Sequence, residues 1–318
     1  MTQATTPSAP ASLTPALLGA VSVGVLTAVQ ARVNGQLGVN LEHPTAAAVI
    51  SFASGLLLIA AISAMTSAGR RGAVALVRGI REHTIPWWML AGGAAGAFTV
   101  ATQSIAVGVV GVSLYTVGIV AGQTLGGLVL DRIGYGPGGA VAVTVPRLVG
   151  GVLALAAVGV VLVAGDGLAG VPVWMVILPV LVGVGLSWQQ ATNGRLRARV
   201  GTPLTATLAN FFVGTAILTV LAVIATIVSG PPAAPPGEPW LYLGGALGVV
   251  YIVMSAAIVV RTGVLLFGLA AVSGQLLAAL ALDAAWPAPA GPGLLVEAIT
   301  VAIGLASVSV AAFWRVRR

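Results

Sequence analysis

Long apolar stretches alternate with short polar connections along the whole chain. Each stretch has about 18 to 25 residues, the length that an α-helix needs to cross roughly 30 Å of hydrocarbon. Gly and Pro inside the stretches do not argue against helix, because both are common in membrane spans. The pattern predicts ten spans, at 14–33, 45–66, 87–108, 111–130, 147–164, 173–192, 206–228, 240–259, 264–282 and 294–313. We therefore expect an all-α integral membrane protein with ten transmembrane helices.

The composition supports this fold class and excludes several kinds of site. Of the 318 residues, 58% are hydrophobic and only 7% are charged, whereas soluble domains have about a quarter charged residues. The chain has no Cys and two His, which removes disulfide frameworks and Cys/His zinc sites. No P-loop is present. We expect no cofactor and no metal.

The basic residues predict the orientation in the membrane. The net charge is +7 and all 14 basic residues are arginines. With the N-terminus inside, thirteen of them fall in cytoplasmic segments and only Arg32 falls outside, as the positive-inside rule requires. We expect a multi-pass protein of the plasma membrane with both termini in the cytoplasm. No basic stripe on a soluble domain is present, so nucleic acid is not an expected partner.

The chain also repeats itself. Gln30 and Asn34, in a Gln-x-x-x-Asn-Gly-x-Leu motif, recur 159 residues later as Gln189 and Asn193. At smaller offsets, Pro86, Trp87 and Gly92 recur as Pro239, Trp240 and Gly245, and Gly122, Gln123, Leu125 and Asp131 as Gly274, Gln275, Leu277 and Asp283. Five spans in each half is an odd number, so the halves have opposite orientations, as in many secondary transporters. We expect a disordered tail at 1–13, a first repeat at 14–165, an inverted second repeat at 172–313 and a basic cytoplasmic tail at 314–318.

These paired motifs, together with Pro146-Arg147-Leu148-Val149-Gly150 at the fifth span, resemble the drug/metabolite transporter superfamily. The most similar branch is the YdcZ-like one, with two five-helix halves fused in one chain, and the resemblance covers about 14–313. It implies ten helices around a central cavity that work by alternating access, and it names no substrate. Gln103 corresponds to Ala256 in our alignment, so the halves differ chemically.

Two glutamines are the candidate substrate-binding residues. Gln123 and Gln275 lie roughly 17 Å deep in spans four and nine, near the midplane. As repeat equivalents they are expected on opposite walls of one cavity, where an amide both donates and accepts hydrogen bonds. The alternative is an interhelical hydrogen bond without a role in transport.

The doubled motif gives candidate gates. Gln30 and Asn34 are expected near the outer face, and Gln189 and Asn193 near the inner face, each pair on one side of its helix. They serve either as a gate at each mouth or as helix ends, because an Asn-Gly step commonly ends a helix.

A few acidic residues lie in or at the ends of the spans. Glu297, about one turn into the last span, is a candidate for coupling transport to a proton gradient, or else an interfacial acid favoured by the helix macrodipole. Asp131 and Asp283, which end spans four and nine, are expected to be structural.

Small residues form ladders on two spans. In the second half, the equivalent positions of Gly118, Gly122 and Gly126 are Ala270, Gly274 and Ala278. Such ladders let two helices cross closely, and they would also allow a homodimer.

The sequence thus predicts a secondary transporter of small polar or amphipathic molecules. The expected partners are a small-molecule substrate and the lipid bilayer. The rival hypothesis is a membrane protein that does not transport, such as a lipid-modifying enzyme or a structural partner. An enzyme is not expected, because ionisable groups do not cluster at one depth. The Gly134-x-Gly136-x-x-Gly139 pattern lacks the strand that a dinucleotide site requires.

Overall fold

The computed structural model describes residues 14–135, 140, 144–163, 172–289 and 293–313. The expected tails at 1–13 and 314–318, and Gly136 and Gly139, lie outside these residues. In the described part every regular element is helical: α1 (Thr14–Asn40), α2 (Pro44–Met65), α3 (Ser67–Arg81), η1 (Trp87–Met89), α4 (Gly92–Val110), α5 (Val112–Arg132), α6 (Val145–Val163), α7 (Val173–Val200), α8 (Pro203–Ser229), η2 (Pro239–Tyr242), α9 (Gly244–Ala285) and α10 (Leu294–Phe313).

The apolar helices agree with a membrane protein. Six helical segments, Thr14–Asn40, Pro44–Met65, Trp87–Val110, Val112–Arg132, Val173–Val200 and Pro203–Ser229, are long and apolar enough to cross a bilayer. In the described residues, four shorter apolar helical segments overlap the other four expected spans: Leu148–Val160, Gly244–Ser255, Ala270–Ala285 and Leu294–Val310. The expected all-helical fold is therefore confirmed for the described residues and agrees with a membrane protein, whereas the number of ten spans stays a prediction.

Equivalent helix starts reflect the repeat. Pro44 and Pro203 each occupy the first turn of a helix, α2 and α8, where a missing N–H costs nothing. The residue before each proline is the N-cap: the His43 ring accepts a hydrogen bond from Ala46 N, and Thr202 Oγ1 accepts one from Leu204 N. The other ring nitrogen of His43 bonds Thr226 Oγ1 at 3.3 Å. His43 thus joins the start of α2 to the end of α8, a structural role.

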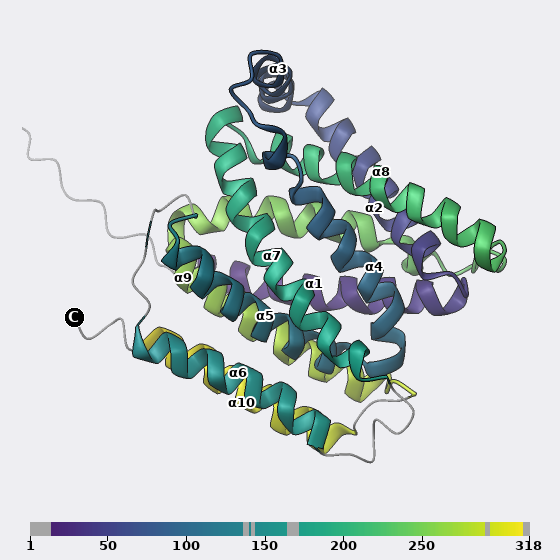
Figure 1. The fold of residues 1–318 in the computed structure, drawn as a ribbon, viewed down its shortest axis with the longest axis vertical. Helices are drawn as coiled ribbons and strands as arrows, with labels where there is room; N and C mark the ends of the chain where they lie inside the picture. Colours follow the sequence, from purple (N-terminus) through teal and green to yellow (C-terminus); the bar gives the residue numbers. More distant parts are fainter. Residues whose placement is uncertain (1–13, 136–139, 141–143, 164–171, 290–292, 314–318) are drawn as a thin grey trace, which may run out of the picture.

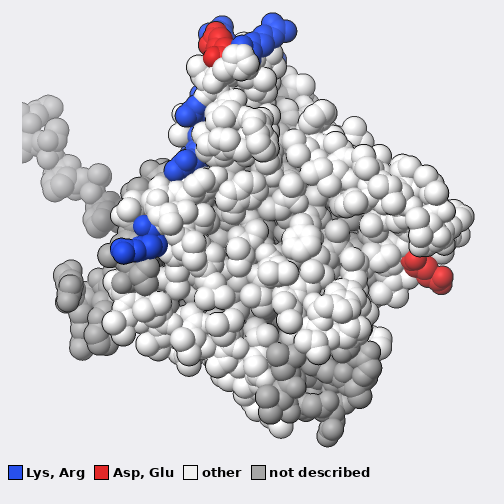
Figure 2. All heavy atoms as spheres, in the orientation of Figure 1, with Lys and Arg blue, Asp and Glu red and all other residues white. Residues whose placement is uncertain are grey.

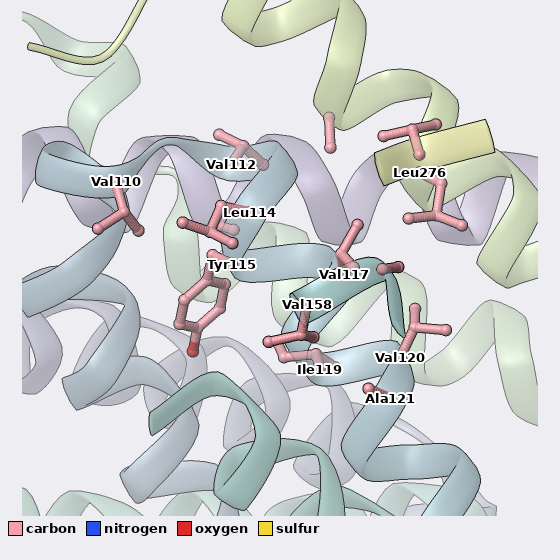
Figure 3. Packing of buried hydrophobic residues seen from close by; sticks show 14 of the residues in the cluster. Val110, Val112, Leu114, Tyr115, Val117, Ile119, Val120, Ala121, Val158 and Leu276 are labelled. Carbon is pink, nitrogen blue, oxygen red and sulfur yellow. The ribbon is translucent and has the colours of Figure 1, made fainter. Parts of the chain in front are cut away.

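The helices form three groups (Figure 1). The paired α6 and α10 lie along one edge, and α2, α8 and α3 lie at the opposite edge. Between them α1 packs extensively on α9, and α5 on α7. The largest apolar core surrounds α5 and includes Val117, Val120 and Leu276 (Figure 3).

The expected spans at 240–259 and 264–282 form one element, α9, which folds back on itself (Figure 1). Gly244, at the start of α9, lies beside Asn34 near the C-terminal end of α1. Ile258 of α9 lies beside Gly19 near the N-terminal end of α1. Further along, Gly274 lies beside Val21. A straight helix would be about 60 Å long at 1.5 Å per residue and could not return to this part of α1. The two arms of α9 therefore run along α1 in opposite directions, like two separate spans.

The structure differs from the sequence-based picture in two places. The Asn-Gly steps do not end helices, because α1 continues from Asn34 to Asn40 and α7 continues from Asn193 to Val200. The helix-end interpretation of these motifs is wrong: a glycine is tolerated inside helices packed in lipid. The polar connection after the second span contains the 15-residue helix α3, which the hydropathy pattern did not predict. Its many arginines and glycines resemble a loop in the sequence, although the segment forms an amphipathic helix.

The small-residue ladders are used inside the chain. Gly118 lies against Pro179, Gly122 against Val180, and Gly126 against Ser187, all of α7. In the second half, Gly274 packs on α1. These helix faces are therefore covered within one chain, and the homodimer stays a prediction without support from them.

Candidate functional site

The charged side chains divide the molecule into two ends. The described arginines of α3 and of the C-terminal parts of α5 and α7 gather along one edge, together with Glu82, and we call this edge the basic end (Figure 2). The opposite edge, which we call the acidic end, carries acidic side chains (Figure 2). Glu42 follows α1 and Glu238 precedes η2 in the connections of this end. Ala233 N donates to the Leu41 carbonyl oxygen at 2.9 Å, which ties the connections of this end together. The helices between the two ends expose mostly apolar side chains.

The two Gln-Asn motifs occupy equivalent places, one toward each end. Gln30 lies in α1 beside Gly248 of α9, and Gln189 lies in α7 beside Gly96 of α4. Gly96 and Gly248 are equivalent positions, 152 residues apart. Each glutamine therefore packs on a glycine that belongs to the other half of the chain. The same relation holds for Phe52 of α2 and Phe211 of α8, whose rings meet 5.1 Å apart between the halves.

The motif toward the acidic end is closed by hydrogen bonds. Gln30 Nε2 donates to the Gly244 carbonyl oxygen at 2.7 Å, and Asn34 Nδ2 donates to Gln103 Oε1 at 2.7 Å. All three side chains are buried. The absence of side chains at Gly35 and Gly38 lets α1 approach α4 at this point. We call the Asn34–Gln103 bond the latch.

The motif toward the basic end has no such latch. Gly92 lies against Asn193 and Asn210, and Gly244 lies against Asn34 and Ser51, their equivalents in the repeat. Gly92 of α4 and Gly244 of α9 are therefore equivalent and 152 residues apart. At this spacing, the residue equivalent to Gln103 is Ser255 and not Ala256. The offset differs from that of the tryptophans because one residue fewer separates Trp240 from Gly244 than separates Trp87 from Gly92. Ser255 Oγ donates to the Tyr251 carbonyl oxygen at 2.6 Å, and this local bond occupies its only donor proton.

Unpaired polar atoms gather at this second motif. The side chains of Asn193 and Asn210 both lie beside Gly92. Asn193 Oδ1 and Asn210 Nδ2 are buried without a hydrogen-bond partner, as is Asn34 Oδ1 in the first motif. An unsatisfied buried polar group costs about 1–3 kcal/mol. Such atoms are therefore suited to bind a polar solute or to change partners during a conformational change.

A cationic cluster lies next to Asn193. The Arg195 guanidinium stacks 4.4 Å from the Tyr135 ring centre and 6.0 Å from the Trp88 ring centre. Tyr135 OH bonds Thr192 Oγ1 at 3.0 Å. This cluster could not be predicted from the sequence, because its members come from three separate segments.

The two candidate substrate-binding glutamines hold equivalent positions in the packing. The backbone of Gln123 lies beside Gly183 of α7, and that of Gln275 lies beside Gly24 of α1. Gln275 is buried and Gln123 is partly buried. Ser187 Oγ donates to the Gln123 carbonyl oxygen at 3.0 Å. Both glutamines therefore lie where one half crosses the other, and their role in binding stays a prediction.

The two carboxylates near the acidic end have different surroundings. Asp283 is structural, as expected: its carboxylate accepts hydrogen bonds from Val112 N at 3.0 Å and Ser113 N at 2.6 Å, at the start of α5. Gly111, just before, has a φ of 88° that favours glycine. Glu297 is buried in the first turn of α10.

Metal binding finds no support in the described residues, which contain no group of three His, Asp or Glu side chains placed to hold an ion.

Comparison with known proteins gives one finding. A family model described as "Putative inner membrane exporter, YdcZ" matches the chain in two segments, residues 15–162 and 174–310. The segments coincide with the two halves of the repeat and together cover most of the chain. No curated protein matches it.

Proposed function

Because the chain belongs to the YdcZ family of inner membrane exporters, we propose that it is a secondary transporter that exports small polar or amphipathic molecules by alternating access. The observation that carries the proposal is the reciprocal packing of the halves. Gln30 and Gln189 each pack on a glycine of the other half, which gives the two halves equivalent contacts. Among the described residues only the motif toward the acidic end also has the latch, which joins α1 to α4 within the first half. Equivalent contacts at two places, with an additional bond at one of them, are what a protein that alternates between two states needs.

The proposed topology has ten spans, with α9 supplying two of them and the halves inverted. It is supported by the six long and four shorter apolar helical segments and by the separation of charge between the two ends. The basic end then faces the cytoplasm. The acidic end, with the latch, is the outer mouth.

The topology predicts where reporters will lie. Fusions at both termini and within 67–81 should report the cytoplasm, because short loops rich in arginine stay inside. A fusion within 231–238 should report the outer side. Reporter fusions active in only one compartment measure this, and termini on opposite sides would contradict the ten-span topology.

In this proposal Gln123 and Gln275 bind substrate, and Gln30, Asn34, Gln189 and Asn193 form the gates. The glutamines lie on the helix pairs α5–α7 and α9–α1, whose crossings are where the halves move against each other. The unpaired Asn193 Oδ1 and Asn210 Nδ2 give a solute an acceptor and a donor near the inner mouth.

Transport by the purified protein is the test of this function. Thermal-shift screening against metabolites and drugs identifies ligands, which are then followed in proteoliposomes. Gln123→Ala and Gln275→Ala should each weaken ligand affinity several-fold, because one hydrogen bond contributes about 0.5–1.5 kcal/mol. Their unfolding temperatures should stay close to that of the unmodified protein. Normal transport in both variants would favour a packing role for these amides.

Glu297 is the proposed coupling residue, because it is a buried acid in an otherwise apolar helix. An imposed proton gradient should drive export of the same ligand in the unmodified protein. The Glu297→Gln variant should lose this drive and keep exchange of ligand across the membrane. Equal response to the gradient in both proteins would remove Glu297 from the coupling.

A further inference from the structure

Helix α3 lies at the basic end and joins α2 to η1. Thr66 caps it by accepting a hydrogen bond from Gly69 N at 3.2 Å. One face of α3 is nearly free of side chains: Gly69 packs on Ser63 of α2, and Gly72 packs on Thr205 of α8. These contacts fix α3 against the ends of two apolar helices and leave its other face uncovered.

The uncovered face combines positive charge with apolar side chains. Arg70, Arg71, Arg78 and Arg81 are all exposed. Among them lie three apolar residues that are also exposed, Val74 at 59%, Val77 at 50% and Ile80 at 41%. In water such exposure of branched aliphatic residues would cost free energy. Together with the arginines they form a face typical of a helix that lies in the membrane interface.

The arginines of α3 have no carboxylate partner within the described part of the chain. Arg70 Nη1 donates instead to the Ala64 carbonyl oxygen at 2.7 Å. A hollow of about 380 Å³ is lined by Arg70, Arg71, Val74, Ala75 and Arg78. A second hollow of about 380 Å³ adjoins it and is lined by Ala75, Arg78, Gly79, Glu82, Thr84, Ile85 and Arg199. Three arginines therefore line the first hollow, and its lining contains no acidic residue.

We propose that α3 binds anionic phospholipid headgroups of the cytoplasmic leaflet. The guanidinium groups of Arg70, Arg71 and Arg78 would pair with phosphate oxygens, for which their planar donors are suited. Val74, Val77 and Ile80 would enter the boundary between headgroups and acyl chains. A free phosphate satisfies the arginines but leaves these apolar side chains in water, and this favours a lipid. The inference does not depend on transport.

The two halves differ at this place. The connection from α8 to η2, which is equivalent in the repeat, contains no helix and has the proline-rich stretch 231–236 instead. A lipid held by α3 therefore acts on the first half alone. It would anchor the joint between α2 and α4 to the cytoplasmic leaflet.

The test compares lipids on the purified full-length protein in detergent. Arg71→Gln/Arg78→Gln removes two arginines that line the hollow, and Arg132→Gln/Arg197→Gln removes the same charge from other helix ends. Val74→Ser/Val77→Ser keeps the charge and removes apolar contact. Thermal unfolding and lipid adducts in native mass spectrometry are measured with phosphatidylglycerol, phosphatidylcholine or inorganic phosphate.

We expect phosphatidylglycerol, and not phosphatidylcholine or phosphate, to raise the unfolding temperature. Binding should weaken about tenfold in Arg71→Gln/Arg78→Gln, because each basic residue contributes to attraction toward an anionic surface. Binding of phosphatidylglycerol should weaken less in the control variant Arg132→Gln/Arg197→Gln. Val74→Ser/Val77→Ser should also weaken this binding. Equal effects of the two lipids, or equal losses in both arginine pairs, would overturn the proposal. Full stabilisation by inorganic phosphate would show a free-anion site instead.

Discussion

Replacing Gly122 by valine is expected to lower the unfolding temperature and the yield of folded protein strongly. The new Cβ would collide with the carbonyl oxygen of Val180 and approach Gly183, both in the backbone of α7. A backbone carbonyl inside a helix cannot rotate away, so α5 and α7 would have to separate. Overpacking a tight contact costs about 1–3 kcal/mol and occasionally more. We expect the upper end of this range, a large part of the roughly 5–15 kcal/mol that stabilises a typical fold.

A neighbouring glycine provides the control. Gly127 lies on the same helix, and a Cβ added there meets no atom within 4 Å. Gly127→Val should therefore express and unfold like the unmodified protein, while Gly274→Val should behave like Gly122→Val, since Gly274 packs on the backbone of Val21. Yield of monodisperse protein and the unfolding temperature measure this. Similar yields from Gly122→Val and Gly127→Val would show that the α5–α7 crossing is not as close as described.

The second large effect is expected from the latch. Gln103→Leu removes the acceptor of the Asn34 amide and leaves Asn34 Nδ2 buried without a partner when the outer mouth is closed. The closed state then loses about 1–3 kcal/mol. When the mouth opens, water satisfies the same amide, so the open state loses little. The equilibrium should move toward the outward-open state by about tenfold.

Ser255→Ala is the matched control for the latch variant. Ser255 holds the equivalent place in the second half, and its hydroxyl bonds only within α9, to the Tyr251 carbonyl oxygen. Its removal should leave the balance of states unchanged. A shift as large as that of Gln103→Leu would mean that both variants act through general loss of stability.

Local patterns predicted the helices well because hydrophobic length determines membrane spans. They failed where one signal has two meanings. The Asn-Gly step that ends helices in water lies inside α1 and α7, where Gly35 instead allows close approach of Val107. Helix α3 was missed because its glycine face and arginines resemble a loop until α2 and α8 are placed against it.

The site was predictable only as far as the repeat reached. Equivalence of Gln123 with Gln275, and of Gln30 with Gln189, follows from the sequence and agrees with the packing. The latch does not, because Gln103 has no counterpart in the second half and its contact with Asn34 joins helices 69 residues apart. The Arg195 cluster was also hidden, since Trp88, Tyr135 and Arg195 meet only after folding.

The central claim is that the outer and inner mouths open in turn. It can be tested with single cysteines, because the chain has none of its own. Val107→Cys places a thiol in the buried contact of α4 with Gly35 of α1, and Asn193→Cys places one at the inner motif. The most direct measurement is the rate at which a membrane-impermeant maleimide labels each cysteine, from outside and inside respectively, with and without Gln103→Leu. Alternating access predicts that Gln103→Leu speeds labelling of Val107→Cys several-fold and slows labelling of Asn193→Cys. Rates that rise together, or that do not change, would contradict it.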